Sequence, residues 1–195
     1  MKSDRRTRTF QMIALGALIC AITVAETTGI DPALLAKAKS GKPGAEVAMG
    51  VCYADGKGVA RDPQQAANWY RKAAEQGYVR GEIRLADLYR DGDGKSFPRD
   101  MQKAAQWYRK AADQGDPGAQ GTLAMLYMLG QGVPQSDLEA YFWFDLAASV
   151  PSPNQARYVI NRQNIGTHIT TGQLAEIQDR ETKWKSAHPQ SGSAK

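Results

Sequence analysis

The side chains that could carry out chemistry in this chain are few and scattered. Only two histidines occur, His168 and His188, and neither has a cysteine or a carboxylate at the spacing of metal ligands. A serine followed three residues later by a lysine, a pair used by enzymes that act on β-lactams, does not occur in the sequence. We therefore predict no catalytic residue, no metal and no cofactor, and we do not expect an enzyme.

Two short runs rich in glycine resemble ion-binding loops but are better explained as turns. Residues 91–94 read DGDG, as at the start of a calcium loop, yet Lys95 and Phe97 stand where such a loop needs further oxygen ligands. Residues 56–58 read GKG, without the rest of a phosphate-binding motif. Both runs fall at the same place in a repeated pattern, and we interpret them as structural turns.

This pattern occurs three times, in residues 45–77, 81–115 and 119–149. Its tyrosines and its tryptophans recur at intervals of 36 or 38 residues. A fixed period in this range is typical of a solenoid, in which each unit buries its apolar face only against its neighbours. Such a fold presents a surface more naturally than it builds a catalytic pocket.

Each repeat predicts two helices. The first, residues 45–55 in the first repeat, has its shared apolar positions three and four residues apart and therefore on one face. Gly56 ends it, because glycine readily takes the left-handed conformation of a helix exit. The second helix begins at Asp62, an N-cap followed by proline, whereas in the third repeat Ser136 and Glu139 predict a capping box.

The second helix carries an aromatic pair set among alanines. The pair at residues 69–70 is Trp-Tyr, and it recurs at residues 107–108 and, as Trp-Phe, at residues 143–144. Alanines that face large rings let two helices pack closely while the rings supply most of the buried area. Because the pair recurs at one position, we predict that both rings belong to the core and do not form a ligand-binding box.

The repeated residues resemble the Sel-like repeat, a relative of the tetratricopeptide repeat. The pattern is A-x-x-x-L-[GA]-x-x-Y-x-x-G-x-G, an aspartate cap, and then A-x-x-W-Y-x-K-A-A-x-x-G, and the resemblance covers residues 45–149. The third repeat departs from it, with Leu146 in place of Lys72 and Lys110. The resemblance implies an all-α fold, a right-handed α/α solenoid of three two-helix repeats that serves as an adaptor for other proteins, often in bacterial envelopes.

The ends of the array need caps, because the end units would otherwise expose core. In front, residues 31–41 predict an N-terminal half-repeat whose short helix is capped by Asp31. Behind, residues 150–187 predict C-terminal capping helices, one from Ser152 to about residue 162 and one over residues 170–187.

The second helix of the third repeat carries an apolar stripe that its siblings lack. Leu138, Phe142 and Leu146 stand where the first two repeats have glutamine, asparagine or lysine. We predict that the C-terminal helices lie on this apolar stripe. The candidate contacts are Tyr158, Ile160, Leu174, Ile177 and Trp184. The alternative is an exposed patch that binds an external partner.

Residues 1–25 have the character of an export signal. A basic head precedes the apolar stretch of residues 12–24, and small residues lead up to Ala25, after which we predict cleavage. The stretch is shorter than the roughly 20 residues of a spanning helix, so we expect no stable membrane span after cleavage. A retained anchor is the alternative. We predict a periplasmic or secreted protein that ends in a disordered tail, residues 188–195.

The charge of the chain does not favour binding to nucleic acid. The whole chain has 25 basic and 20 acidic side chains. Residues 1–25 hold four of the basic and one of the acidic ones, which leaves 21 against 19 after cleavage. Most of the apparent basicity therefore belongs to the export signal, and nucleic acid is not an expected partner.

The first helices also carry positions at which the three repeats differ while their core positions agree. In tetratricopeptide-like solenoids this side lines the concave groove, so we predict a partner-binding surface there. Its candidate residues are Val51, Arg84, Asp87, Arg90, Asp91, Met125, Met128 and Leu129. The methionines suit a surface that adapts to varied partners. A solvated face without a binding role is the alternative.

These features predict a non-catalytic scaffold of the bacterial envelope that binds a protein or peptide partner along the concave face of the solenoid. The alternative function is an envelope hydrolase that acts on peptidoglycan or β-lactams. A serine or His168 would be needed for the hydrolase, whereas the scaffold would depend on charges such as Arg84. The identity of the partner does not follow from the sequence.

Overall fold

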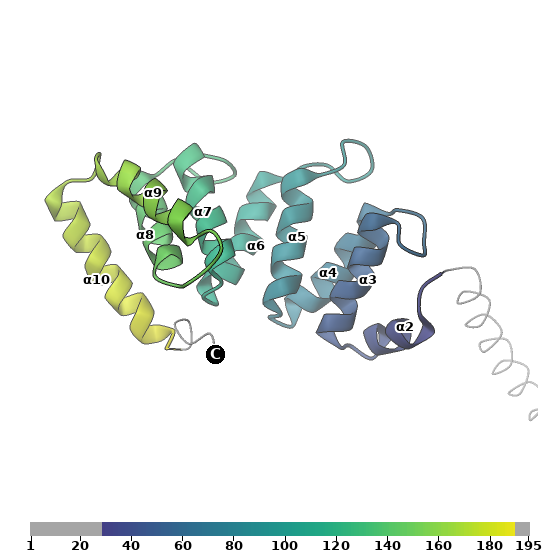
Figure 1. Cartoon of the computed structure of the whole chain (residues 1–195). Coiled ribbons are helices and arrows are strands. Elements are labelled where there is room, and N and C mark those ends of the chain that lie inside the picture. Colours follow the sequence, from purple (N-terminus) through teal and green to yellow (C-terminus); the bar gives the residue numbers. More distant parts are fainter. Residues whose placement is uncertain (1–28, 190–195) are drawn as a thin grey trace, which may run out of the picture.

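The computed structural model describes residues 29–189, and within that range the chain forms nine helices and no strand (Figure 1). The predicted export signal, residues 1–25, and residues 190–195 of the predicted tail lie outside the described residues. No helix in the described range is long and apolar enough to cross a membrane. The helices are α2 (Pro32–Lys39), α3 (Pro43–Asp55), α4 (Pro63–Glu75), α5 (Val79–Asp91), α6 (Met101–Asp113), α7 (Pro117–Leu129), α8 (Asp137–Ala148), α9 (Gln155–Gly166) and α10 (Thr171–Ala187).

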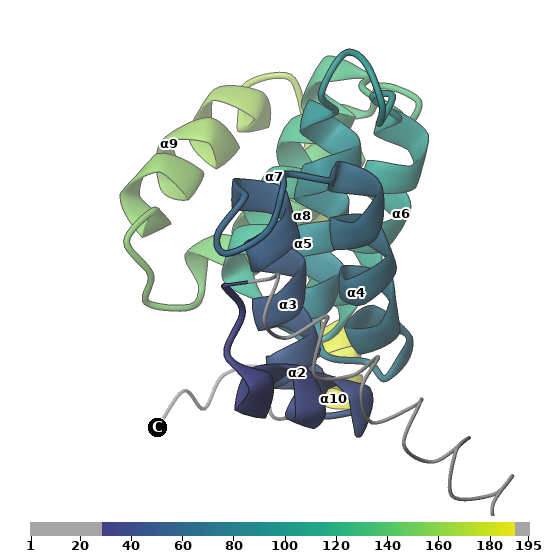
Figure 2. The same ribbon diagram turned by 90° about the vertical axis from the view of Figure 1, so that its right-hand side faces the viewer.

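The helices form a right-handed α/α solenoid, as the sequence predicted. The pairs α3–α4, α5–α6 and α7–α8 stack in chain order from one end of the molecule to the other (Figure 1). In the end-on view of Figure 2, α3, α5 and α7 form one side and α4 and α6 the other. The helix α9 lies on the side of the first helices and reaches beyond them (Figure 2). We call the outward side of the first helices, α3, α5 and α7, the inner face.

Caps and glycines set the ends of the helices. The Asp62 carboxylate accepts from the backbone N–H of Gln65 at 3.0 Å, and Asp100 does the same for Lys103 at 2.9 Å. At the other end, Gly56 closes α3 with a φ of 73°, in the left-handed region that glycine enters freely. The two-helix unit thus follows from local chemistry.

The predicted capping box at the start of α8 is only half present. The Ser136 hydroxyl accepts from the Glu139 backbone N–H at 3.3 Å. The Glu139 carboxylate does not return to Ser136, because it binds both guanidinium nitrogens of Arg180 on α10. A bidentate contact to a guanidinium is stronger than one to a backbone N–H.

The core is built from one ring of each aromatic pair, so the prediction for the other ring needs correction. Tyr70, Tyr108 and Phe144 are each at most 3% exposed. Trp69 and Trp107 are only half-buried, and the ammonium groups of Lys72 and Lys110 lie over their rings. A lysine stem over an indole shields it from water while the charge stays solvated. Only Trp143 is fully buried, because α10 covers it.

Buried acids join the two helices of the first two repeats. Gln76 at the end of α4 donates to the carboxylate of Glu46 on α3 at 2.7 Å. Gln114 does the same for Glu82 at 2.8 Å in the next repeat. Burial raises the pKa of both carboxyls. The third repeat has Gln120 at this position, which donates to a backbone carbonyl and needs no proton.

The helix α10 lies on the apolar stripe of α8, where the sequence placed it. Phe142 and Leu146 are each 1% exposed, and the guanidinium of Arg180 stacks on the Phe142 ring at 3.9 Å. Trp184 meets Trp143 edge-on, with ring centroids 6.4 Å apart. Ile177 is buried in the same cluster. The C-terminal helix therefore closes this end of the core.

Two details of the C-terminal segment were predicted wrongly. The helix α9 is preceded by Asn154, not capped by Ser152, and it extends to Gly166. Ile160 is 54% exposed and does not cover the stripe. On α10, Glu181 is 7% exposed and faces α8.

Candidate binding surface

Four of the predicted binding residues surround one pocket on the inner face. Val51 from α3 and Arg84, Asp87 and Asp91 from α5 line a cavity of about 220 Å³ between the first two repeats. Residues three and four apart on α5 lie on one side of that helix, as the sequence pattern required. Asp55, Arg61 and Tyr70 complete the polar part of the lining. We call this cavity the inner pocket.

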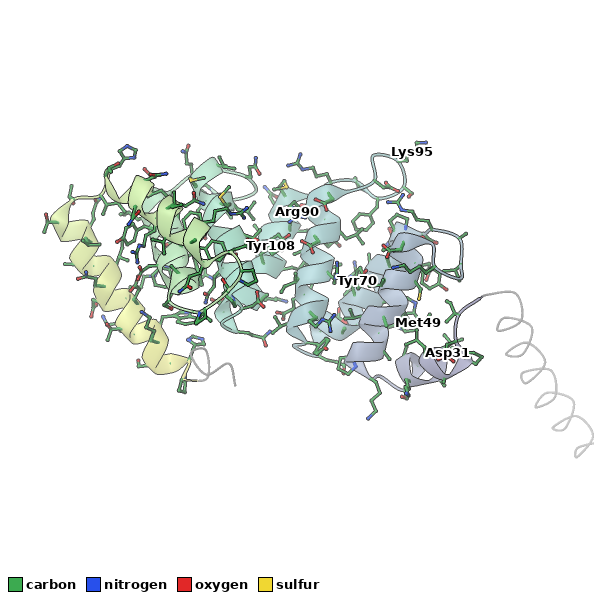
Figure 3. The ribbon with its side chains drawn as sticks, in the orientation of Figure 1. Asp31, Met49, Tyr70, Arg90, Lys95 and Tyr108 are labelled. Atoms are coloured by element: carbon green, nitrogen blue, oxygen red, sulfur yellow. The ribbon has the colours of Figure 1, made fainter. Side chains whose placement is uncertain are left out.

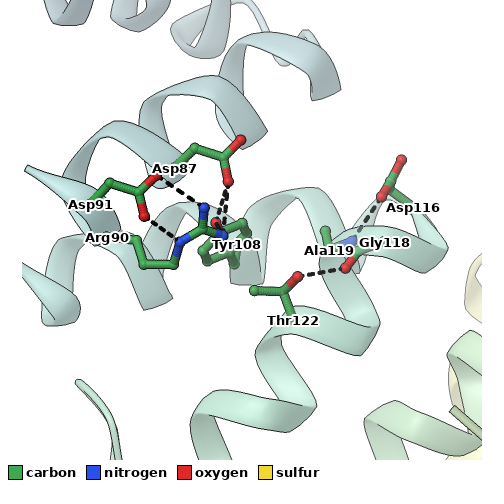
Figure 4. Close-up of polar contacts among 8 residues, drawn as sticks. All are labelled: Asp87, Arg90, Asp91, Tyr108, Asp116, Gly118, Ala119 and Thr122. Carbon is green, nitrogen blue, oxygen red and sulfur yellow. Dashed lines mark hydrogen bonds and ion pairs between the residues drawn. The ribbon is translucent and has the colours of Figure 1, made fainter. Parts of the chain in front are cut away.

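Two of its carboxylates are tied to a buried tyrosine (Figure 4). The Tyr108 hydroxyl donates to Asp87 Oδ1 at 2.5 Å and accepts from Arg90 at 2.7 Å. The Arg90 guanidinium also binds both oxygens of Asp91, at 2.8 and 3.1 Å. Burial, and then the bond to Asp87, raise the pKa of Tyr108, and the bond to Asp91 raises that of Arg90. Arg90 is thus shared by Asp87 and Asp91 and has both carboxylates as partners.

Arg84 is placed differently from these paired charges. Its side chain is exposed and lines the inner pocket, and within residues 29–189 it has no ion pair within 4.0 Å. Asp55 across the pocket already pairs with Lys57 at 2.6 Å, and this contact lowers the pKa of Asp55. Arg84 is therefore the inner-face guanidinium with most freedom to meet a partner.

The methionine-rich part of the predicted surface lies on α7, away from the inner pocket. Met125 and Met128 are half-buried and pack on the core, and Leu129 is 52% exposed. The Nδ2 group of Asn161 on α9 donates to the sulfur of Met125 at 3.6 Å. The inner face thus has a charged part over α3 and α5 and an apolar part over α7. Use of either part in binding remains a prediction.

The hydroxyl of Tyr70 was not predicted to belong to the binding surface. Tyr70 was assigned to the core, and its ring is indeed buried, but the residue also lines the inner pocket. A signal was present in the sequence, because the third repeat has Phe144 at this position. A phenylalanine ring is therefore enough for packing at this position. The hydroxyls of Tyr70 and Tyr108 need a separate explanation.

The turn interpretation of the DGDG run agrees with the structure. The Asp93 carboxylate accepts from the backbone N–H groups of Lys95 at 2.9 Å and Phe97 at 2.7 Å, and from the Ser96 hydroxyl. These bonds lower the pKa of Asp93. Phe97 is buried against Tyr89. The carboxylate therefore organises its own loop. Across residues 29–189, no group of three or more metal-ligating side chains is present.

Larger hollows lie on the side of the second helices. One of about 560 Å³ is bounded by α6, α7 and the loop at residues 130–134, and its lining includes Arg109 and Tyr127. Another of about 510 Å³ lies between α2 and α4, beside Trp69. The Arg109 guanidinium packs on Trp143 at 4.9 Å and pairs with Asp113, so its charge is already used within the chain.

The stacked helix pairs define an α/α repeat solenoid. Its inner face varies from repeat to repeat, as is typical of repeat proteins that bind partners through their surface. The model of the Sel1 repeat matches residues 43–78, 79–116 and 118–149. The chain belongs to the Sel1 repeat family, which confirms the resemblance seen in the sequence. Proteins with these repeats generally mediate protein–protein interactions and are typically non-catalytic scaffolds.

Three solved structures are similar to this chain. A Sel1 repeat protein from Oxalobacter formigenes is 29% identical, with a TM-score of 0.57, over 67% of this chain and 95% of that one. Cysteine-rich protein B of Helicobacter pylori is 23% identical, with a TM-score of 0.49, over 64% of this chain and 93% of that one. The protective antigen c5321 of uropathogenic Escherichia coli is also 23% identical, with a TM-score of 0.45, over 81% and 49%. No curated protein matches the sequence.

Proposed function

We propose that this protein is a non-catalytic scaffold of the bacterial envelope that binds a protein or peptide along its inner face. The observation that carries the proposal is the difference between core and inner-face positions. Core positions stay apolar or aromatic across the repeats, whereas one inner-face position holds Val51, Asp87 and Met125 in the three repeats. A surface that only had to be soluble would not need an apolar end over α7 and a charged pocket over α5.

The proposed location rests on the export signal expected in residues 1–25. The location and the binding face can both be tested in the native envelope. A photo-crosslinking amino acid is introduced at Arg84 or Leu129 on the inner face, and at the exposed Gln64 on α4 as a control. Fractionation then reports where the protein resides, and crosslinking reports which face is covered.

We expect the two inner-face positions to capture the same protein and Gln64 to capture none. Charge reversal, Arg84→Glu, should reduce the capture at Leu129 several-fold, because the substitution places a fourth carboxylate at the inner pocket. Equal capture from Gln64, or capture from neither inner-face position, would reject binding along the inner face. Recovery of the protein in the cytoplasm alone would reject the envelope location.

A further inference from the structure

Tyr70 and Tyr108 occupy the same position in successive repeats but have different surroundings (Figure 3). The Tyr108 hydroxyl is satisfied by Asp87 and Arg90, both from the first helix of its own repeat. On α3 the equivalent residues are Val51 and Ala54, which offer no hydrogen-bonding side chain. The first repeat therefore lacks both groups that satisfy the hydroxyl in the second.

The Tyr70 hydroxyl has no hydrogen-bond partner among residues 29–189. The residue is 3% exposed, and its ring lies against Gly50, where a Cβ would come within 2.3 Å of the ring. Burial raises the pKa of Tyr70 to about 12, so the hydroxyl is protonated at neutral pH and available as a donor. Tyr70 belongs to the lining of the inner pocket, so its hydroxyl can donate to a group bound there.

The charges around the inner pocket indicate which acceptor is missing. Each carboxylate in the lining already has a cation: Asp55 pairs with Lys57, and Asp87 and Asp91 pair with Arg90. Arg84 lines the pocket without an ion pair within the described residues, and its charge acts on Tyr70 and on Asp55. A neutral donor and a guanidinium without an acceptor therefore face the same space.

We infer that the inner pocket takes the carboxylate of a glutamate or aspartate in a bound peptide, which accepts from the Tyr70 hydroxyl and pairs with Arg84. The contact between Asp87, Tyr108 and Arg90 is the internal template, because it joins a carboxylate, a tyrosine hydroxyl and a guanidinium. The cavity of about 220 Å³ is several times the roughly 30 Å³ share of one water molecule, so it has room for a side chain. This inference rests on the proposed function and names the chemistry of the partner.

Fluorescently labelled octapeptides test the inference on the chain without its export signal. The probes alternate glycine with glutamate, glutamine or lysine, and binding is followed by fluorescence anisotropy at low salt. We expect the glutamate peptide to bind at least about tenfold more tightly than the glutamine peptide, because hydrogen bonds to a charged group are the strong ones. Tyr70→Phe, which removes only the hydroxyl, should abolish this preference, and Arg84→Gln should weaken it.

Tyr127→Phe is the matched control, because it removes a hydroxyl from the larger hollow between α6 and α7. It should leave the preference for glutamate unchanged, and circular dichroism should show equal helix content in all variants. Equal binding of the glutamate and glutamine peptides, or tighter binding of the lysine peptide, would overturn the inference. A preference for glutamate that survives Tyr70→Phe would overturn the assignment to this pocket.

The two proposals fail in distinguishable ways. If Tyr70→Phe leaves capture by the photo-crosslinker at Leu129 intact and the glutamate peptide does not bind, the scaffold function stands and the carboxylate site falls. If the glutamate peptide binds through Tyr70 but neither inner-face position captures a protein, the site stands and the function in the envelope falls.

Discussion

The hydroxyl of Tyr108 lies 2.5 Å from a carboxylate oxygen of Asp87, whereas Tyr70, one repeat earlier, has Val51 at the equivalent place. Both tyrosines are at most 3% exposed, so burial does not distinguish them. Their hydroxyls differ in whether the chain itself supplies an acceptor. Two chemically identical substitutions in one molecule should therefore have unlike effects on stability.

Replacement of each tyrosine by phenylalanine measures this difference. Tyr108→Phe should lower the free energy of unfolding by about 1.5–3 kcal/mol, because it removes a hydrogen bond to a charged group. Tyr70→Phe should change it by less than about 0.5 kcal/mol, or raise it, since no bond is lost. Urea unfolding with an unchanged m-value gives both numbers. Equal losses in the two variants would contradict the difference in hydrogen bonding.

Removal of the tryptophans should show how far α10 seals the core. Trp143→Ala should cost about 3–5 kcal/mol, the range for a fully buried aromatic residue. Trp107→Ala, at the same position one repeat earlier, should cost less than about 2 kcal/mol, because its half-buried ring packs mainly under Lys110. Thermal or urea unfolding of the two variants compares them. A larger loss at Trp107 would show that α10 does not protect this end.

A glycine on α7 should resist substitution while a glycine on α10 should not. A Cβ at Gly121 would lie 2.2 Å from the ring of Tyr158, so Gly121→Ala should cost about 1–3 kcal/mol through displacement of α9. Gly172 has nothing within 4 Å of an added Cβ, and Gly172→Ala should stabilise by about 0.4–1 kcal/mol. Melting temperatures measured side by side suffice. A stable Gly121→Ala variant would place Tyr158 elsewhere.

Glu181 should make stability fall as the pH rises. Burial and the facing Asp145 raise its pKa to about 8 from 4.5, although Lys185 lies 3.6 Å away. Asp145 is in turn paired with Arg162, and Tyr141 also lies within reach of the Glu181 charge. Between these two pKa values the folded state binds a proton that the unfolded state releases. The stabilisation is therefore complete below about pH 4.5 and is lost as the pH rises through about 8.

The variant Glu181→Gln isolates this effect from the other buried acids, Glu46 and Glu82, which titrate in both proteins. It mimics the protonated carboxyl, so it should match the wild-type chain at pH 5. At pH 8.5 it should be more stable by roughly 1–2 kcal/mol. Urea midpoints measured at the two pH values test this, and an identical pH dependence in both proteins would show that Glu181 is ionised throughout.

Most of the fold could be predicted because its determinants are local and repeated. The aspartate caps, the closing glycines and the alanine positions act within one or two turns of the chain, and three copies expose the pattern. The apolar stripe on α8 was also readable, because Leu138, Phe142 and Leu146 break a polar pattern set by their siblings.

The errors arose where two distant segments compete for one group. The Glu139 carboxylate could accept from the backbone at the start of its own helix or from Arg180. In the folded chain it accepts from the Arg180 guanidinium, and the local sequence does not reveal this contact. Only part of the lining of the inner pocket was predicted. Tyr70 was missed because its ring belongs to the core, although the residue also lines the pocket.

The seal that α10 forms over α8 has a consequence for how such a gene can change its length. A repeat duplicated after Ala148 would leave two apolar stripes and one helix to cover them, so that copy would be selected against. Units inserted before Asp116 would keep the α7–α10 segment intact, with Gly121 beneath Tyr158 and Trp143 beneath Trp184. Longer descendants of this chain should therefore carry their additional repeats on the N-terminal side of Asp116.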